Sequence, residues 1–352
     1  MRMKFQKAKN VDSQAKGLAL DRLRIAGLFL AIVMAAIVFQ SQTPAFLSSQ
    51  NLLTLLRAMS SLGIMAFAQM LVILLGEIDL SLGAVYGLSA TTLAVCWLGG
   101  GALPFRIPLI AALIIAFLVA IGIGAANAFL TSVVKIPSFI ATLGFLSLAQ
   151  GSELLLSNAS TFNPAYNNPL PPTWELNFFH TIGASKLPFG VPVQVGWFAL
   201  MFLFFWILRH RTLFGFRLGA IGGNPTAAEI AKLPIQKYKF IVFMLSASMA
   251  ALAGILDFSY VGSVGPNSGG ALVFPVIAAV VIGGASLTGG FGTIPATLLG
   301  ATLLAVLANG LALLGVGAFA QLIFVGFVTI GAVTLDKVTR QVANKRLNRI
   351  SQ

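Results

Sequence analysis

Long apolar runs constrain the fold of this chain more than any other feature. Only 9 % of its 352 residues are charged, whereas soluble domains carry roughly 25 %. This composition excludes a water-soluble enzyme, a nucleic-acid binder and a disordered chain. A membrane-spanning helix needs about 20 mostly apolar residues. Candidate segments lie at 25–43, 54–75, 82–99, 108–133, 138–157, 193–209, 240–262, 272–284, 292–313 and 318–335, the eighth being short. We therefore expect an all-α polytopic membrane protein with about ten transmembrane helices.

The basic residues are strongly segregated along the chain. The net charge is +13, but 18 of the 22 lysines and arginines lie within 1–24, 209–239 and 337–349. Lysine and arginine accumulate on the cytoplasmic side of membrane proteins. Ten helices would place these three segments and Lys135 on the same side. We therefore expect both termini in the cytoplasm of a bacterial inner-membrane protein, which contacts lipid and no nucleic acid.

This topology divides the chain into three parts. Residues 1–24 form a basic cytoplasmic N-terminus, residues 25–335 a transmembrane domain and residues 336–352 a basic cytoplasmic tail. We interpret the run after the N-terminus as an uncleaved membrane helix and not as a signal peptide. The segment 158–192 is rich in proline and asparagine, so it is predicted to be an irregular extracytoplasmic loop.

Cysteine and histidine are too scarce for two kinds of site. Cys96 is the single cysteine, so the chain cannot form an internal disulfide framework. His180 and His210 are the two histidines, and with one cysteine they are too few for a structural zinc site of four such ligands. No metal site is expected.

Two apolar runs end in the same short pattern. GEIDLSLG at 76–83 and GGASLTGG at 283–290 match at a constant offset of 207. Paired interruptions of membrane helices indicate a transport pathway. The sequence match could also be a coincidence. It does not decide whether the two halves are parallel or inverted. Asp79 could instead be the N-cap of the next helix. The pathway candidates in these breaks are Glu77, Asp79, Ser81, Ser286 and Thr288.

Amide side chains within the apolar runs are further candidates. Each could line a pathway or form a hydrogen bond between helices. They are Gln69, Asn127, Gln150 and Asn309.

The basic segment 209–239 contains a helix signal. Asn224 provides an N-cap, and Pro225 suits the first helical turn. We predict a helix of two to three turns over 224–232, preceded by a hinge at Gly222 and Gly223. Such a helix could dock into a partner or lie on the membrane surface.

The stretch RLGAIGGNPTAAEIA in this loop resembles the coupling loop of the permeases of ATP-binding-cassette importers of the ribose/xylose type. Three other stretches also resemble this family and occur in the family's order over about residues 50–315. They are GEIDLSLG, IPSFIATLG and GGASLTGGFG. One departure is Lys232, where the family often has glycine. The resemblance implies a type II importer-like permease that contacts the ATPase through Gly222, Gly223, Asn224, Pro225, Ala228 and Glu229.

The resemblance also implies the partners. They are a second permease, identical or not, two copies of a cytoplasmic ATPase that binds ATP and Mg, and an extracytoplasmic sugar-binding protein. This chain would bind no cofactor itself. It contains no Gly-Lys dipeptide and hence no phosphate-binding loop, so it is not expected to be an enzyme.

The leading hypothesis is thus the permease subunit of a monosaccharide importer. An alternative is an ion- or proton-coupled transporter, whose coupling carboxylates would be Glu77, Asp79, Glu153 and Asp257. The same importer architecture could also serve a nucleoside, a branched-chain amino acid or a signalling sugar. A membrane-embedded enzyme is disfavoured, because the chain lacks a recognisable nucleophile–base motif.

Overall fold

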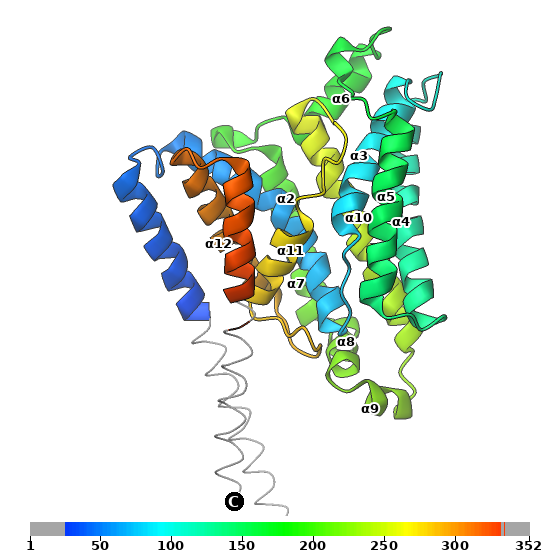
Figure 1. Ribbon diagram of the computed structural model, residues 1–352, viewed down its shortest axis with the longest axis vertical. Helices are drawn as coiled ribbons and strands as arrows, with labels where there is room; N and C mark the ends of the chain where they lie inside the picture. Colours follow the sequence, from blue (N-terminus) through cyan, green and yellow to red (C-terminus); the bar gives the residue numbers. More distant parts are fainter. Residues whose placement is uncertain (1–24, 332–333, 335–352) are drawn as a thin grey trace, which may run out of the picture.

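The computed structural model describes residues 25–331 and residue 334, and this part of the chain is built from α-helices (Figure 1). The predicted basic ends, 1–24 and 336–352, lie outside the described residues. A first helix, Ile25–Gln42, and a last one, Ala318–Gly331, flank the labelled helices. These are α2 (Ser49–Leu74), α3 (Leu82–Leu98), α4 (Leu109–Ser132), α5 (Ser138–Ser157), α6 (Thr173–Gly183), α7 (Val193–His210), α8 (Leu213–Gly223), α9 (Pro225–Ile230), α10 (Ile235–Val261), α11 (Val273–Ile282) and α12 (Ile294–Leu313).

The ten predicted membrane segments are all helical in the described part of the chain. Seven helices there are long and apolar enough to cross a membrane. The other three are shorter, namely α3, α11 and Ala318–Gly331. The fold is therefore that of an all-helical polytopic membrane protein, as the sequence predicts.

Helices α2 and α3 form the centre of the bundle. Every residue of α3 is buried, as is the whole of α2 from Met59 to Leu74. A helix that is apolar on all sides is expected to be buried in this way. Peripheral helices instead expose large apolar side chains, among them Leu118 of α4, Leu148 of α5 and Leu203 of α7. Such an apolar perimeter suits contact with lipid.

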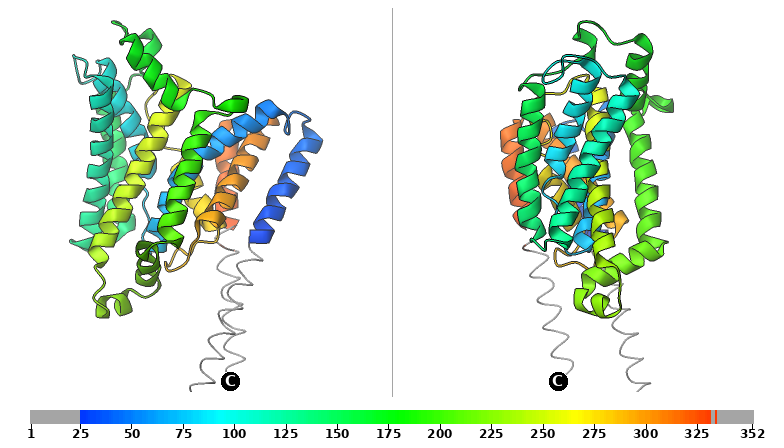
Figure 2. Two further views of the ribbon diagram at one scale, coloured as in Figure 1. Left: turned by 180° about the vertical axis from the view of Figure 1, so that it is seen from behind. Right: turned by 90° about the vertical axis from the view of Figure 1, so that its right-hand side faces the viewer.

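The two halves of the bundle run in opposite directions (Figures 1 and 2). We call the end of the bundle that carries α6 the α6 face, and the end that carries α8 and α9 the α9 face. Helix α2 runs from the α6 face to the α9 face and α3 returns, whereas α10 starts at the α9 face and α11 runs back towards it. The relation of the halves, which the sequence leaves open, is therefore inverted.

An interruption precedes α3 in the first half and α11 in the second half. Residues 75–81 precede α3, and residues 262–272 precede α11. The starts of these two helices touch, because a Cβ atom on Gly83 would lie 2.7 Å from the carbonyl oxygen of Gly269. The break that corresponds to 76–83 in the inverted repeat is thus 262–272, and the segment 283–290 occupies a different place.

The prediction of an irregular loop over 158–192 is wrong, because α6 lies within it. No proline lies between Pro172 and Pro188, so the residues after Pro172 are free to form a helix. Glu175 anchors this helix: it accepts hydrogen bonds from Trp97 Nε1 at 2.6 Å, from Arg106 Nη2 at 3.0 Å and from the Leu109 amide at 3.2 Å. Three donors on the bundle therefore fix α6 to it.

The segment 209–239 contains two helices where one was predicted. Helix α8 was missed, and Thr212 caps its N-terminus by accepting from the Gly215 amide. Helix α9 has six residues and ends earlier than predicted. Lys232 follows it with a φ of 55°, the left-handed conformation that favours glycine. Lys232 thus adopts a conformation that glycine accepts readily, and the lysine backbone is strained.

Candidate functional site

Three backbone segments meet at the α9 face, and we call this contact the glycine junction. It consists of Leu74–Gly76 at the end of α2, Gly222–Gly223 at the end of α8, and Gly289–Gly290. The Gly290 amide donates a hydrogen bond of 2.8 Å to the Leu74 carbonyl oxygen. The two segments with matching sequences thus meet, and the end of α8 lies between them.

The glycine junction leaves no room for a side chain on Gly222. A Cβ atom there would overlap the carbonyl oxygen of Leu74 and lie 2.8 Å from the amide nitrogen of Gly290. Gly223 is different, because its nearest neighbour would be Gly290 Cα at 3.7 Å. Both glycines are the last residues of α8 and not a hinge before a helix. The chain changes direction one residue later, at Asn224.

Asp79 is buried at the centre of a hydrogen-bond network in the first break. One carboxylate oxygen accepts from the Ser81 amide at 2.9 Å and from the Ser81 hydroxyl at 2.6 Å, and the other accepts from Ser246 at 2.8 Å. Asn127 donates to the Ser81 hydroxyl at 2.9 Å. Ser81 is the N-cap residue of α3, so Asp79 is not itself the N-cap. The network ties the break to α4 and α10.

The remaining polar candidates are not gathered at one point. Ser286 and Thr288 share a hydroxyl–hydroxyl hydrogen bond of 2.8 Å in their own segment. Gln150 donates to Asn267 Oδ1 at 3.2 Å, and Asn309 exchanges two hydrogen bonds with Asn51. These two amides therefore form contacts between segments, as the alternative interpretation predicts. In the part of the chain that is described, both amide atoms of the buried Gln69 and the Oδ1 atom of Asn127 have no partner.

A second polar network lies towards the α6 face, and sequence reasoning did not assemble it. Asp257 of α10 accepts from Ser61 at 2.8 Å, Tyr86 at 2.7 Å and Gln194 at 3.2 Å. Arg57 forms an ion pair with it at 3.3 Å. The Asp257 network therefore joins α2, α3, α7 and α10. The sequence signal is a polar residue within the apolar run of each of these four helices, and of these residues only Asp257 is a candidate named from the sequence.

Glu153 holds the second break in place. It is buried on α5 and accepts from the Ser268 amide at 3.3 Å. Its carboxylate lies against Gly87 of α3, where a Cβ atom would approach it to 2.8 Å. Each break is thus supported by a buried carboxylate from the chain, Asp79 in one case and Glu153 in the other.

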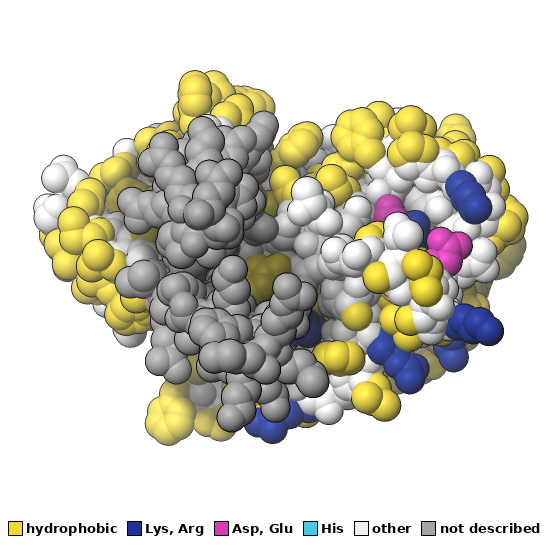
Figure 3. Space-filling view, turned by 90° about the horizontal axis from the view of Figure 1, so that it is seen from below, with side chains coloured by type: hydrophobic (Ala, Val, Ile, Leu, Met, Phe, Trp, Pro, Cys, Tyr) yellow, Lys and Arg dark blue, Asp and Glu magenta, His cyan; other side chains and the backbone are white. Residues whose placement is uncertain are grey.

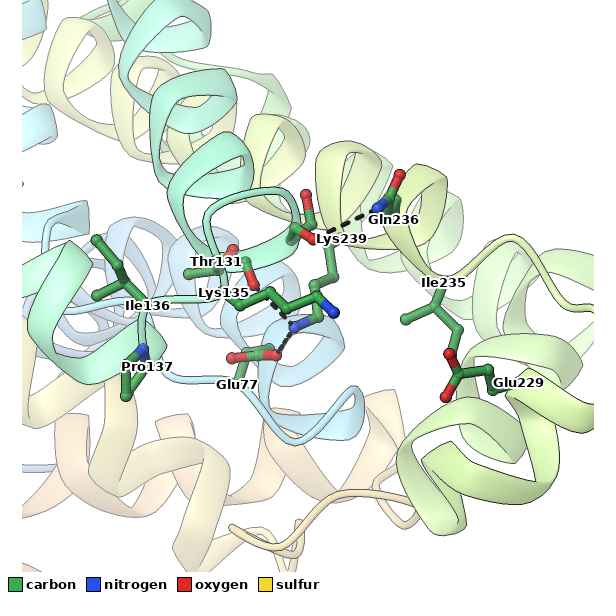
Figure 4. A pocket seen from close by; sticks show the side chains of 10 residues that line it. Glu77, Thr131, Lys135, Ile136, Pro137, Glu229, Ile235, Gln236 and Lys239 are labelled. Atoms are coloured by element: carbon green, nitrogen blue, oxygen red, sulfur yellow. Dashed lines mark hydrogen bonds and ion pairs between the residues drawn. The ribbon is translucent and has the colours of Figure 1, made fainter.

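A cavity of about 440 Å³ opens at the α9 face between α9, the turn from α4 to α5 and the start of α10 (Figure 4). Glu77 and Lys239 form an ion pair in its wall, and Lys239 Nζ also donates to the Thr131 carbonyl oxygen at 3.4 Å. Lys135 and Glu229 extend from opposite walls and do not touch (Figure 4). The cavity therefore presents one positive and one negative side chain without an ion-pair partner in the described structure.

The predicted coupling residues divide between two sides of α9. Ala228 is 4 % exposed and packs against the core, so it cannot reach a partner. Asn224 caps the helix by accepting from the Ala227 amide at 2.9 Å. The exposed side carries Asn224, Pro225, Thr226, Ala227, Glu229 and Ile230. Seen from the α9 face, lysine and arginine side chains surround two acidic groups (Figure 3).

These features define a class of protein. Interrupted helices, an inverted repeat and polar networks inside an apolar bundle are the marks of a membrane transport protein. The comparison with known families is more specific, because residues 51–333 match the family described as branched-chain amino acid transport system/permease component. The chain belongs to this family of transport permeases.

Curated relatives resemble the chain over most of its length. The ribose import permease protein RbsC of Bacillus subtilis is 34 % identical, with 91 % of this chain and 95 % of the relative covered. The xylose transport system permease protein XylH of Escherichia coli is 30 % identical, with coverage of 92 % and 94 %. The probable ABC transporter permease protein YphD of Escherichia coli is 34 % identical, covering 85 % of each chain. No solved structure matches the chain significantly.

Proposed function

We propose that this chain is the permease subunit of an ATP-binding-cassette importer and forms the membrane pathway for a monosaccharide. The relatives that transport ribose and xylose support the substrate class. The observation that carries the mechanism is the glycine junction, in which the coupling loop lies between two segments that follow membrane helices. Nucleoside, branched-chain amino acid and signalling-sugar transport remain alternatives for the same architecture.

The proposed partners follow from this role. A separate cytoplasmic ATPase would bind ATP and Mg and contact the exposed side of α9, where Asn224, Pro225 and Glu229 lie. An extracytoplasmic sugar-binding protein would deliver the substrate to the α6 face, and a second permease would complete the assembly. In this arrangement the α9 face and both termini are cytoplasmic, and this chain binds no cofactor.

The site residues receive distinct roles in this proposal. Helix α9 would move with the ATPase, and Gly222 would transmit this movement to the end of α2 and to the segment between α11 and α12. Glu77 is connected to α10 by its ion pair with Lys239, so the first break would move with that helix. The polar groups that would respond to this movement of the first break are Asp79, Ser81, Asn127 and Gln69.

Ile230 is the residue that tests the coupling surface. It is 79 % exposed on α9, so its replacement by glutamate removes little packing within this chain. We expect Ile230→Glu to insert and fold normally but to copurify with at least tenfold less of the cognate ATPase, because a charge would be buried at an apolar contact. Ile230→Leu is the matched control and should retain the ATPase.

A tryptophan at Ile230 separates docking from a helix that lies on lipid. Tryptophan favours membrane interfaces, so a surface helix should tolerate Ile230→Trp. A docked helix should lose affinity for the ATPase. ATPase copurification that is unchanged in both the glutamate and the tryptophan variant would contradict the proposed coupling surface.

Single cysteines test the orientation. In a background with Cys96→Ala, we expect a cysteine at Asn168 to react with an impermeant thiol reagent added to intact cells. Cysteines at Thr226 and Ser351 should react only after the cells are opened. Labelling of the Thr226 cysteine in intact cells would show that the orientation is the reverse of the proposed one. Labelling of the Ser351 cysteine alone would show that the number of membrane helices is wrong.

The ion-coupled alternative has a specific difficulty. Its four carboxylates are all engaged: Glu77 with Lys239, Asp79 with Ser81 and Ser246, Glu153 with Ser268, and Asp257 with Arg57. A coupling role would require these contacts to break in each cycle. Uptake that persists when the proton gradient is collapsed, and that needs ATP, would exclude this alternative.

A further inference from the structure

The turn from α4 to α5 contains a lysine whose backbone is strained. Lys135 has a φ of 63°, in the left-handed region where a residue other than glycine or asparagine is rare. Glycine at this position would relieve the strain. Residues held in such conformations cluster at functional sites. The Lys135 side chain is therefore a candidate for a functional contact at this turn.

The surroundings of Lys135 do not explain it. Its side chain is exposed and extends over the Glu77–Lys239 ion pair into the cavity beside α9 (Figure 4). Glu77 is already paired with Lys239, and Glu229 lies across the cavity without contacting Lys135. Within the described residues, the ammonium group has no acidic partner.

The cavity is continuous with the exposed side of α9. Glu229 belongs to that side and also lines the cavity, so a molecule that covers α9 from the cytoplasm would also cover the cavity opening. This end of the chain is predominantly basic (Figure 3). Interfaces place complementary charges opposite one another, so such a partner should carry an acidic group where it meets Lys135.

We propose that the cavity between α9 and the turn from α4 to α5 is a second docking site for the ATPase subunit, in which an acidic side chain of that subunit binds Lys135. This inference rests on the proposed function, because it assumes that the ATPase covers α9. It adds a contact at Lys135, which lies outside the coupling loop and far from it in sequence. The ATPase would then hold two separate segments of the bundle, α9 on one side and the α4–α5 turn on the other.

The test compares two lysines of the full permease. Lys135→Glu should weaken the binding of the purified cognate ATPase to the permease in nanodiscs by about tenfold or more, as expected for a reversed charge opposite an acid. Lys237→Glu is the matched control: Lys237 is exposed on the first turn of α10 and does not line the cavity. Its effect should be less than about twofold, and the difference should shrink at high salt.

Lys135→Gly removes the charge while it relieves the backbone. This variant should be at least as resistant to thermal unfolding as the parent and should still bind the ATPase several-fold more weakly. Loss of affinity therefore cannot be attributed to misfolding. Affinity of Lys135→Glu and Lys135→Gly equal to that of the parent would overturn the proposal.

A charge exchange distinguishes the ATPase from a partner within this chain. If Lys135 instead pairs with Glu229 when the cavity closes, the double variant Lys135→Glu/Glu229→Lys should recover ATPase binding, and this outcome would overturn the proposal. We expect no recovery from that exchange and recovery from an acid-to-lysine change in the ATPase. The coupling surface itself is judged separately by the two Ile230 variants. If both bind the ATPase normally, the proposed coupling surface fails; if they bind weakly and Lys135→Glu binds normally, the second docking site fails alone.

Discussion

Gly222→Ala is expected to stop transport, although alanine is normally the residue that helices accept best. The new Cβ atom would overlap the Leu74 carbonyl oxygen and lie 2.8 Å from the Gly290 amide nitrogen, whose mutual hydrogen bond closes the glycine junction. Backbone atoms cannot turn aside as a flexible side chain can, so α8 must move away. Overpacking of this kind costs about 1–3 kcal/mol. The two segments would then lose their common contact with the coupling loop.

Gly223→Ala is the control, because it makes the same change one residue further along α8. Its Cβ atom would lie 3.7 Å from Gly290 Cα, an ordinary contact. We expect substrate uptake by reconstituted transporter to fall at least tenfold in Gly222→Ala and to remain within about twofold of the parent in Gly223→Ala, since ~1.4 kcal/mol corresponds to a factor of ten. Equal uptake by the two variants would contradict a role for the junction in coupling.

The helices were predictable because lipid imposes a simple rule on sequence. A segment that crosses a bilayer must satisfy its backbone polar groups internally and present apolar side chains, which leaves long apolar runs. Short helices outside the bilayer follow no such rule. Helix α8 was missed because its sequence, LFGFRLGAIGG, mixes helix formers with four glycines, and it is stabilised by contacts with the glycine junction. Helix α6 was missed because nearby prolines dominated the prediction.

The candidate site was predictable only in part. The matching segments 76–83 and 283–290 do meet in space, yet they are not equivalent in the inverted repeat. The similarity of the two segments reflects that both need glycine and short polar residues. It does not mean that they occupy equivalent positions in the inverted repeat. Burial of Ala228 could not be foreseen either, because a helix of six residues is too short to show a periodic pattern. Pairing of isolated polar residues, such as Arg57 with Asp257, depends on helix packing that the sequence does not specify.

Asp257→Ala is expected to destabilise the bundle clearly. The substitution removes the acceptor for Ser61, Tyr86 and Gln194 and leaves the Arg57 charge without its partner. Removing one member of a fully buried ion pair costs about 3–5 kcal/mol, and we expect a smaller loss here because both side chains are partly exposed. The thermal unfolding midpoint of the purified protein in detergent should therefore fall clearly.

The double variant Arg57→Met/Asp257→Ala distinguishes a structural role of the ion pair from a role in proton coupling. Replacing both charges by apolar groups is often neutral, because the uncompensated charge disappears with its partner. We expect the unfolding midpoint to recover towards that of the parent, and sugar uptake to recover with it, if the pair only holds α2 and α10 together. A proton-coupled transporter would behave differently: the double variant would regain stability, but uptake would stay abolished because the coupling carboxylate is gone. Recovered stability without recovered, ATP-dependent uptake would therefore favour the ion-coupled alternative over the importer permease.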